Sequence, residues 1–154
     1  MHKIEKAMIQ RIQTVFIFVA TLLVSTLYKL KFAALVVNDE LLTFTAKGIS
    51  NSTEVVFDGL PILIFIGIIA ILHVVVIFMY KKRLRQIRML AFTMILLLGL
   101  FGMFFYFTYA GFENAKVAFK VPVAFPLVAI ILDYLAIRAI GKDEALVRSI
   151  NRIR

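Results

Sequence analysis

The sequence predicts an all-α membrane protein, a bundle of four transmembrane helices with both termini in the cytoplasm. Three observations lead to this fold class. First, 62% of the 154 residues are hydrophobic and the mean hydropathy is +0.97, whereas soluble domains are about 45–50% apolar. Second, the apolar residues are gathered into four runs of roughly membrane-spanning length. Third, Lys and Arg flank these runs, and most of them fall on one side of the predicted membrane.

The four runs are residues 12–28, 60–80, 89–109 and 121–140, which together form a single predicted domain, 1–154. A hydrocarbon core of about 30 Å needs about 20 apolar residues in a helix that rises 1.5 Å per residue. The first run is short, so we expect this helix to stand nearly upright or to thin the bilayer locally. The fourth run carries Pro122, which a first helical turn tolerates, and Pro126, which we expect to kink the helix or to end a frayed first turn.

The basic residues predict the orientation. Five Lys lie in the first and third connections, and the other 13 of the 18 Lys and Arg lie at the termini or in the second connection. Because short cytoplasmic segments are enriched in Lys and Arg, we expect both termini inside, which requires an even number of spans. The 13 residues are Lys3, Lys6, Arg11, Lys81, Lys82, Arg83, Arg85, Arg88, Arg138, Lys142, Arg148, Arg152 and Arg154.

The outer connection, residues 29–59, is predicted to be a loop with a weakly indicated hairpin. Residues 41–44 and 53–57 are rich in Thr, Val and Phe, and Lys47-Gly48 and Ser50-Asn51 between them are typical turn residues.

On the third span, the aromatic residues between 101 and 107 are expected to face lipid rather than a cofactor.

The cytoplasmic tail, residues 141–154, is predicted to form a separate helix on the membrane surface. Gly141 is expected to end the fourth span. Beyond it Leu146, Ile150 and Ile153 fall on one helical face, with Arg148 and Arg152 on a neighbouring face. This pattern is typical of a basic amphipathic helix against anionic headgroups, although an ordinary solvated tail remains the alternative.

Asp133 is the one acidic residue inside a predicted span, and His73 is the one histidine inside a predicted span. A charge in mid-bilayer costs at least about 2.5–3.5 kcal/mol, so such residues are usually partnered or functional. Each lies seven residues before the inner end of its span, hence about 10 Å above the inner boundary. We therefore expect a hydrogen-bonded pair, serving as a structural clasp or as a proton- or ion-linked site. Asp133 could instead reach Arg11 or Arg138, or the two side chains could fail to meet.

The residues that the sequence lacks exclude several classes of enzyme. It has no Cys, and His2 and His73 are its only histidines, which are too few for a zinc, haem or di-iron site. No second acid accompanies Asp133 inside a span, and there is no Gly-rich phosphate loop. We therefore predict no catalytic residues, no metal site and no cofactor.

The basic residues at the inner surface are interpreted as contacts with anionic lipid. The run 81–88 could bind nucleic acid in isolation, but its role in setting the topology explains it more simply, so no nucleic-acid partner is expected. This membrane-surface set comprises Lys81, Lys82, Arg83, Arg85, Arg88, Arg148 and Arg152.

Two stretches, MIQRIQTV at 8–15 and RAIGKDEALVRS at 138–149, resemble a family of small four-span membrane proteins of Bacteroidota bacteria. No function is assigned to that family, so the resemblance implies a place in the bacterial inner (cytoplasmic) membrane but no reaction. Its members often begin at the MIQRIQ motif, so residues 1–7 are expected to be an extension or to reflect a different start codon.

Taken together, these features predict a non-enzymatic inner-membrane protein. We expect an accessory or scaffold subunit that packs against other integral membrane proteins or against further copies of itself. The alternative is a small proton- or ion-coupled transporter that uses Asp133 and His73, because a carrier needs polar groups near mid-membrane.

Overall fold

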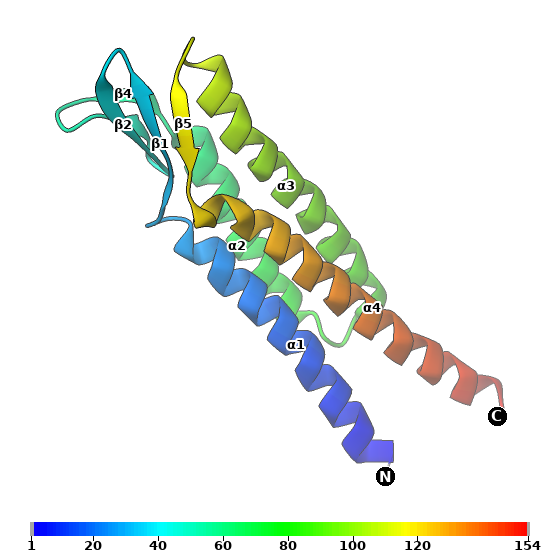
Figure 1. Ribbon diagram of the computed structural model, residues 1–154. Coiled ribbons are helices and arrows are strands. Elements are labelled where there is room, and N and C mark those ends of the chain that lie inside the picture. The colour runs from blue at the N-terminus through cyan, green and yellow to red at the C-terminus, as the bar shows by residue number, and fades with distance from the viewer. Residues whose placement is uncertain (1, 154) are drawn as a thin grey trace.

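The computed structural model describes the backbone of residues 2–153 and the side chains of residues 12–153. Over these residues the chain forms four long helices that lie side by side (Figure 1). Three helical segments are long and apolar enough to cross a membrane, and the apolar part of the remaining helix is shorter, Ile12–Thr26. The chain is therefore a membrane protein. The helices are α1 (His2–Thr26), α2 (Leu60–Phe78), α3 (Arg83–Ala110) and α4 (Phe125–Arg152), with a 3-10 turn, η1 (Val121–Ala124), leading into α4.

The helices form a four-cornered bundle. α1 and α3 each pack against both α2 and α4, so α2 and α4 occupy diagonally opposite corners. Buried positions recur alternately three and four residues apart, a spacing that keeps one stripe of each helix against its neighbours. On α2 these positions are Ile62, Ile66, Ile69, His73 and Val76, and on α4 they are Pro126, Ala129, Asp133, Ala136, Ile140 and Asp143.

A five-stranded antiparallel sheet covers the end of the bundle opposite the two termini (Figure 1). The prediction of an all-α fold with an outer loop at 29–59 is therefore wrong. The strand order is β4-β3-β2-β1-β5, in which the last strand comes from the connection between α3 and α4. The strands are β1 (Lys31–Val37), β2 (Glu40–Thr45), β3 (Gly48–Ser50), β4 (Val55–Asp58) and β5 (Lys116–Phe119).

The predicted hairpin between residues 41–44 and 53–57 has the wrong partners. β2 pairs with β1 and β3, and β4 pairs with β3 rather than with β2. The three-residue strand β3 lies between the two predicted segments, directly after the turn at Lys47. Gly48 makes this turn possible, because its φ is +121° and a Cβ there would collide with the carbonyl oxygen of Phe57.

Aromatic side chains join the sheet to the bundle. Phe104 of α3 is fully buried, with ring centroids 4.4 Å from Phe32 and 6.1 Å from Phe44. Phe107 meets Phe57, with ring centroids 4.7 Å apart. The expectation that this aromatic run faces lipid is thus wrong for these rings, because the C-terminal part of α3 forms the surface against which the sheet packs.

The tail is not a separate helix. α4 runs without interruption from Phe125 to Arg152, through Gly141, so the predicted end of the helix at this glycine is wrong. Two ion pairs support the extension, one from Arg83 of α3 to Asp143 at 2.9 Å and one within α4 from Arg148 to Glu144 at 3.1 Å. Such i, i+4 pairing stabilises a helix, and side-chain contacts of this kind outweigh the weak helix propensity of a single glycine.

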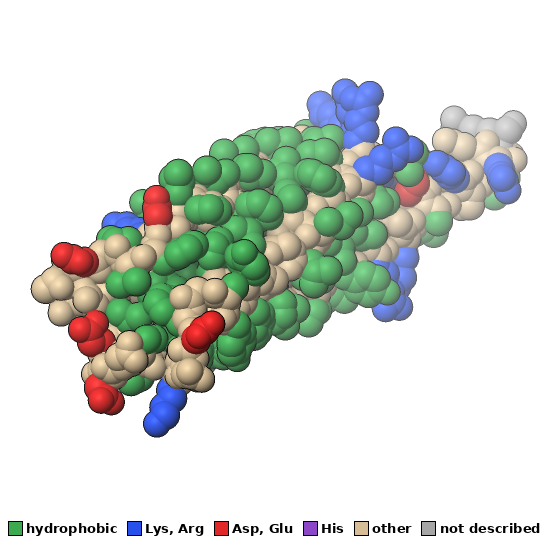
Figure 2. Space-filling view, turned by 90° about the horizontal axis from the view of Figure 1, so that it is seen from above, with side chains coloured by type: hydrophobic (Ala, Val, Ile, Leu, Met, Phe, Trp, Pro, Cys, Tyr) green, Lys and Arg blue, Asp and Glu red, His purple; other side chains and the backbone are tan. Residues whose placement is uncertain are grey.

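The charged residues separate toward the two ends of the molecule. In Figure 2 a broad apolar belt covers the middle, with acidic side chains gathered at the sheet end and most of the basic ones at the other end. The belt comes from large side chains exposed on all four helices, such as Phe18 of α1, Ile71 of α2, Ile95 of α3 and Ile131 of α4. A surface of this kind is stable against lipid but not against water.

Candidate functional site: a buried histidine–aspartate bridge

The centre of the candidate site is a hydrogen bond between diagonally opposite helices. Nε2 of His73, on α2, lies 3.1 Å from both carboxylate oxygens of Asp133, on α4. The heptad-like spacing of buried positions turns both residues toward the bundle axis. The structure thus brings together the two residues that the sequence placed at matching depth. Both side chains are fully buried, at 0% exposure.

The second ring nitrogen fixes the proton count of the bridge. Nδ1 of His73 lies 2.9 Å from the carbonyl oxygen of Ile69, and because a carbonyl can only accept, Nδ1 carries a hydrogen and donates it. One further proton then joins Nε2 to the Asp133 carboxylate. Whether that proton rests on nitrogen or on oxygen, the pair has no net charge, and with the proton on oxygen both groups are neutral, which is the state that costs less to bury.

The bridge divides the apolar interior into two clusters. Toward the sheet, Ile69 of α2, Leu97 of α3 and Ala129 of α4 belong to the larger cluster. Toward the termini, Ile17 of α1, Val76, Leu90, Ala136 and Ile140 form the smaller one. Between them, α3 contributes the buried Thr93, whose hydroxyl donates to carbonyls of its own helix at 2.9 Å. The polar layer is therefore enclosed on both sides by hydrocarbon.

Two alternative partners for the Asp133 carboxylate were expected, Arg138 and Arg11. Arg138 is exposed one and a half turns further along α4, and the side chain of Arg11 lies outside the described residues. Over residues 12–153 the structure holds no group of three or more His, Cys, Asp or Glu side chains arranged to bind a metal ion.

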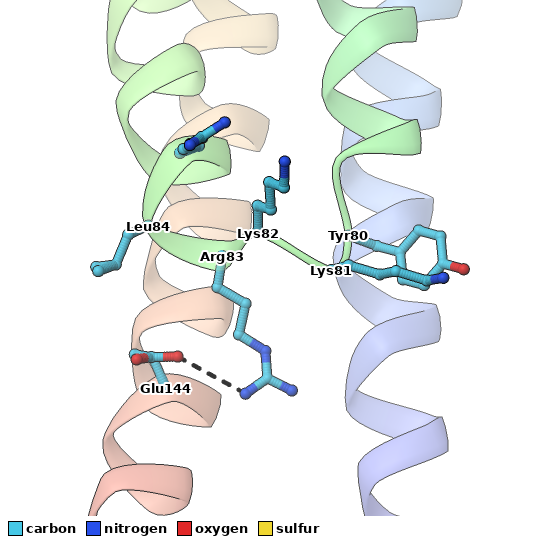
Figure 3. A pocket seen from close by; sticks show the side chains of 7 residues that line it. Tyr80, Lys81, Lys82, Arg83, Leu84 and Glu144 are labelled. Carbon is cyan, nitrogen blue, oxygen red and sulfur yellow. Dashed lines mark ion pairs between the residues drawn. The ribbon is translucent and has the colours of Figure 1, made fainter.

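A second cluster of sequence-predicted residues lines a cavity at the end of the bundle that carries the termini. Figure 3 shows it around the short connection between α2 and α3, where Arg83 turns toward Glu144. Its volume is about 580 Å³, and its lining consists of Tyr80, Lys81, Lys82, Arg83, Leu84, Arg85 and Glu144. The remaining predicted basic residues, Arg88, Arg148 and Arg152, are exposed outside this cavity.

The sequence matches one described family over residues 9–153, "Domain of unknown function (DUF4293)". The chain belongs to this family. The matched range includes the His73–Asp133 bridge, the basic cavity and every strand of the sheet. No curated protein and no solved structure matches the chain.

Sequence reasoning missed two polar contacts of this DUF4293 domain. Asp143 is buried and bound by Arg83 from another helix. Gln86, also buried, donates from its amide nitrogen to the carbonyl oxygen of Val76 at 3.0 Å. A signal for both existed, because a polar residue at a heptad-spaced buried position needs a partner.

Proposed function

We propose that this DUF4293 protein is a four-span protein of the bacterial inner membrane with both termini in the cytoplasm. α1 supports the fourth span, because its apolar part packs between α2 and α4 and exposes Ile12, Val15, Phe18 and Leu22 on its outer side. The 13 Lys and Arg at the termini and in the α2–α3 connection favour the cytoplasmic side for that end of the bundle. The sheet then lies on the outer surface. The resemblance to Bacteroidota proteins supports the choice of the inner membrane.

We further propose that the protein is a non-enzymatic accessory or scaffold subunit that packs against other integral membrane proteins. The observation that carries this proposal is the enclosure of the one intramembrane polar pair: His73 and Asp133 are fully buried, with an apolar cluster on either side. A group that must exchange a proton or an ion with water needs an aqueous route. A neutral bridge sealed in hydrocarbon instead stabilises one arrangement of the helices.

The second candidate function is a proton- or ion-coupled carrier. It is favoured by the titratable groups of the same His73–Asp133 pair. A histidine that shares one proton with a carboxylate inside a membrane domain is a common element of proton relays. For this function the helices would have to separate at the polar layer during each cycle. The sheet opposes such a movement, because it ties the β1–β4 segment between α1 and α2 to the β5 segment between α3 and α4.

Crosslinking of native membranes followed by mass spectrometry separates the two functions. An accessory subunit is expected to give reproducible crosslinks to one integral membrane protein, and these should persist in Asp133→Asn if that protein still folds. The carrier is favoured if no stable partner is found and vesicles containing the purified protein show proton-dependent uptake that Asp133→Asn abolishes. His73→Phe provides a second variant at the same bridge.

A further inference from the structure

The basic cavity beside the α2–α3 connection holds more positive charge than the surrounding protein neutralises. Of its four cationic side chains, Arg83 is occupied by Asp143 at 2.9 Å and Glu144 at 3.8 Å. Lys81, Lys82 and Arg85 form no ion pair with any residue whose side chain the structure describes. In Figure 3 the Lys82 side chain rises into the opening between the α2 and α3 columns, whereas the Lys81 side chain extends alongside Tyr80. Lys81 lies over the ring of Tyr80, 5.8 Å from its centroid, so the cavity lining includes three cations that no described carboxylate neutralises.

The backbone adds hydrogen-bond donors to the same place. α3 begins at Arg83 without a side-chain cap and without an acid in its first turn. The first bond of this helix runs from the N–H of Gln86 to the carbonyl oxygen of Lys82, so the N–H groups of residues 83–85 have no acceptor within the helix. Amides at a helix start bind anions, since the helix dipole is positive there.

The lining of the cavity is amphipathic. Beside the cations it includes Tyr80 and Leu84, which are about half exposed, at 50% and 49%. The cavity therefore presents exposed apolar surface next to its cationic groups. A soluble anion gains nothing from these side chains, whereas a phospholipid can place its phosphate among the cations and its apolar part along Tyr80 and Leu84.

We propose that this cavity is a specific binding site for the phosphate group of an anionic phospholipid from the inner leaflet. Lys81, Lys82 and Arg85 contact the phosphate oxygens together with the first N–H groups of α3. The Arg83–Asp143 ion pair holds α3 against α4 and so keeps the cavity open. The site rests on the membrane orientation proposed above, but it does not depend on the accessory role.

Native mass spectrometry of the purified protein with phosphatidylglycerol tests the site. The variant Lys81→Gln/Lys82→Gln/Arg85→Gln is compared with the control Arg138→Gln/Lys142→Gln/Arg152→Gln, which removes three exposed cations outside the cavity at the same end of the molecule. We expect phosphatidylglycerol binding to weaken about tenfold or more in the first variant and less than about twofold in the control. Equal losses in the two variants would overturn the proposal, because diffuse attraction to a charged surface depends on the number of cations near it.

A second measurement uses the unaltered protein, so it holds even if the triple variant fails to fold. Dioctanoyl phosphatidylglycerol is compared with dioctanoyl phosphatidylcholine and with glycerol 3-phosphate by calorimetry in detergent. The proposal requires the first to bind most tightly. If glycerol 3-phosphate binds equally well, the cavity is a site for soluble phosphate esters and the lipid assignment is wrong. Cysteine labelling at the two ends of the bundle tests the orientation separately.

Discussion

At the scale of single residues, the bridge between His73 and Asp133 joins two helices that are not neighbours in the bundle. Neighbouring helices are held by continuous stripes of side chains, whereas α2 and α4 meet across the axis through this polar contact. In a membrane, contacts between apolar side chains are not strengthened by water, so hydrogen bonds contribute more of the specificity of packing. The bridge is thus expected to fix the register of α2 against α4.

A double-mutant cycle tests this expectation. Asp133→Asn and His73→Phe should each destabilise the protein, and the double variant should lose less than the sum of the two. The coupling free energy should lie within about 0.6–1.7 kcal/mol, the range of hydrogen bonds inside membrane proteins. Unfolding by sodium dodecyl sulfate in mixed micelles measures it. As the control, His73→Phe with Thr21→Ala should be additive, because the Thr21 hydroxyl donates within its own helix, to Ile17.

Gly48 is the residue on which the sheet is expected to depend most. Alanine at this position would combine a strained positive φ with a collision against the backbone of Phe57. Gly48→Ala should cost about 1–3 kcal/mol locally and increase trypsin cleavage at Lys47 in spheroplasts. Gly67→Ala is the matched control, because a Cβ at Gly67 meets no atom within 4 Å. Equal protection of both variants from trypsin would contradict the turn geometry.

At the scale of elements, α4 is expected to behave as one helix from the membrane into the cytoplasm. Gly141 lies in its interior, with no atom within 4 Å of an added Cβ. Gly141→Ala should therefore stabilise the helix by about 1 kcal/mol, as alanine does in helix interiors. The stability can be measured in the same micelles. A loss of stability in this variant would indicate that the chain bends at residue 141, as the sequence pattern alone suggested.

The contact between α3 and the α4 extension should depend on Arg83. Arg83→Gln leaves the buried carboxylate of Asp143 without its partner, so amide hydrogen exchange across residues 141–152 should become faster. Arg85→Gln, which removes an exposed cation two residues away, should leave that exchange unchanged. A slow, unaltered exchange in Arg83→Gln would show that the extension does not need this ion pair.

The elements differ in how well the sequence predicts them. The long hydrophobic runs without charges predicted the positions of α2 and of the central part of α3 closely. A run of this kind has few alternatives to a helix in a membrane. The sheet was missed because its strands are three to seven residues long and one of them, β5, follows two helices later. Such pairing leaves no local signal, since register depends on partners distant in sequence.

The His73–Asp133 bridge could be predicted because few polar residues lie inside the spans. Two isolated polar residues in apolar spans, at equal distance from the inner boundary, leave few partners to consider. The Arg83–Asp143 ion pair could not be predicted in this way. Many charged residues lie near this end of the helices in the sequence, and several pairings among them are possible. The basic cavity was missed likewise: its cations were visible in the sequence, but the space between them depends on how α2, α3 and α4 are arranged.

At the scale of the whole molecule, two features oppose each other across the apolar belt, a folded sheet at one end and a basic, helical end at the other (Figures 1 and 2). This polarity explains how one short chain can contact three environments. In the orientation proposed above, the belt would meet lipid, the basic end an anionic surface, and the sheet the opposite compartment. The proposed accessory role uses the first and the last of these.

The most direct test of the account is therefore the position of the two ends relative to the membrane. The chain contains no cysteine, so single cysteines at the exposed positions Asn38, Asn114 and Ala145 can be labelled one at a time. With a membrane-impermeant maleimide, intact spheroplasts should label Asn38→Cys and Asn114→Cys, and Ala145→Cys should react only after the membrane is permeabilised. Labelling of Ala145→Cys in intact spheroplasts, or protection of Asn114→Cys, would contradict four spans with the sheet outside.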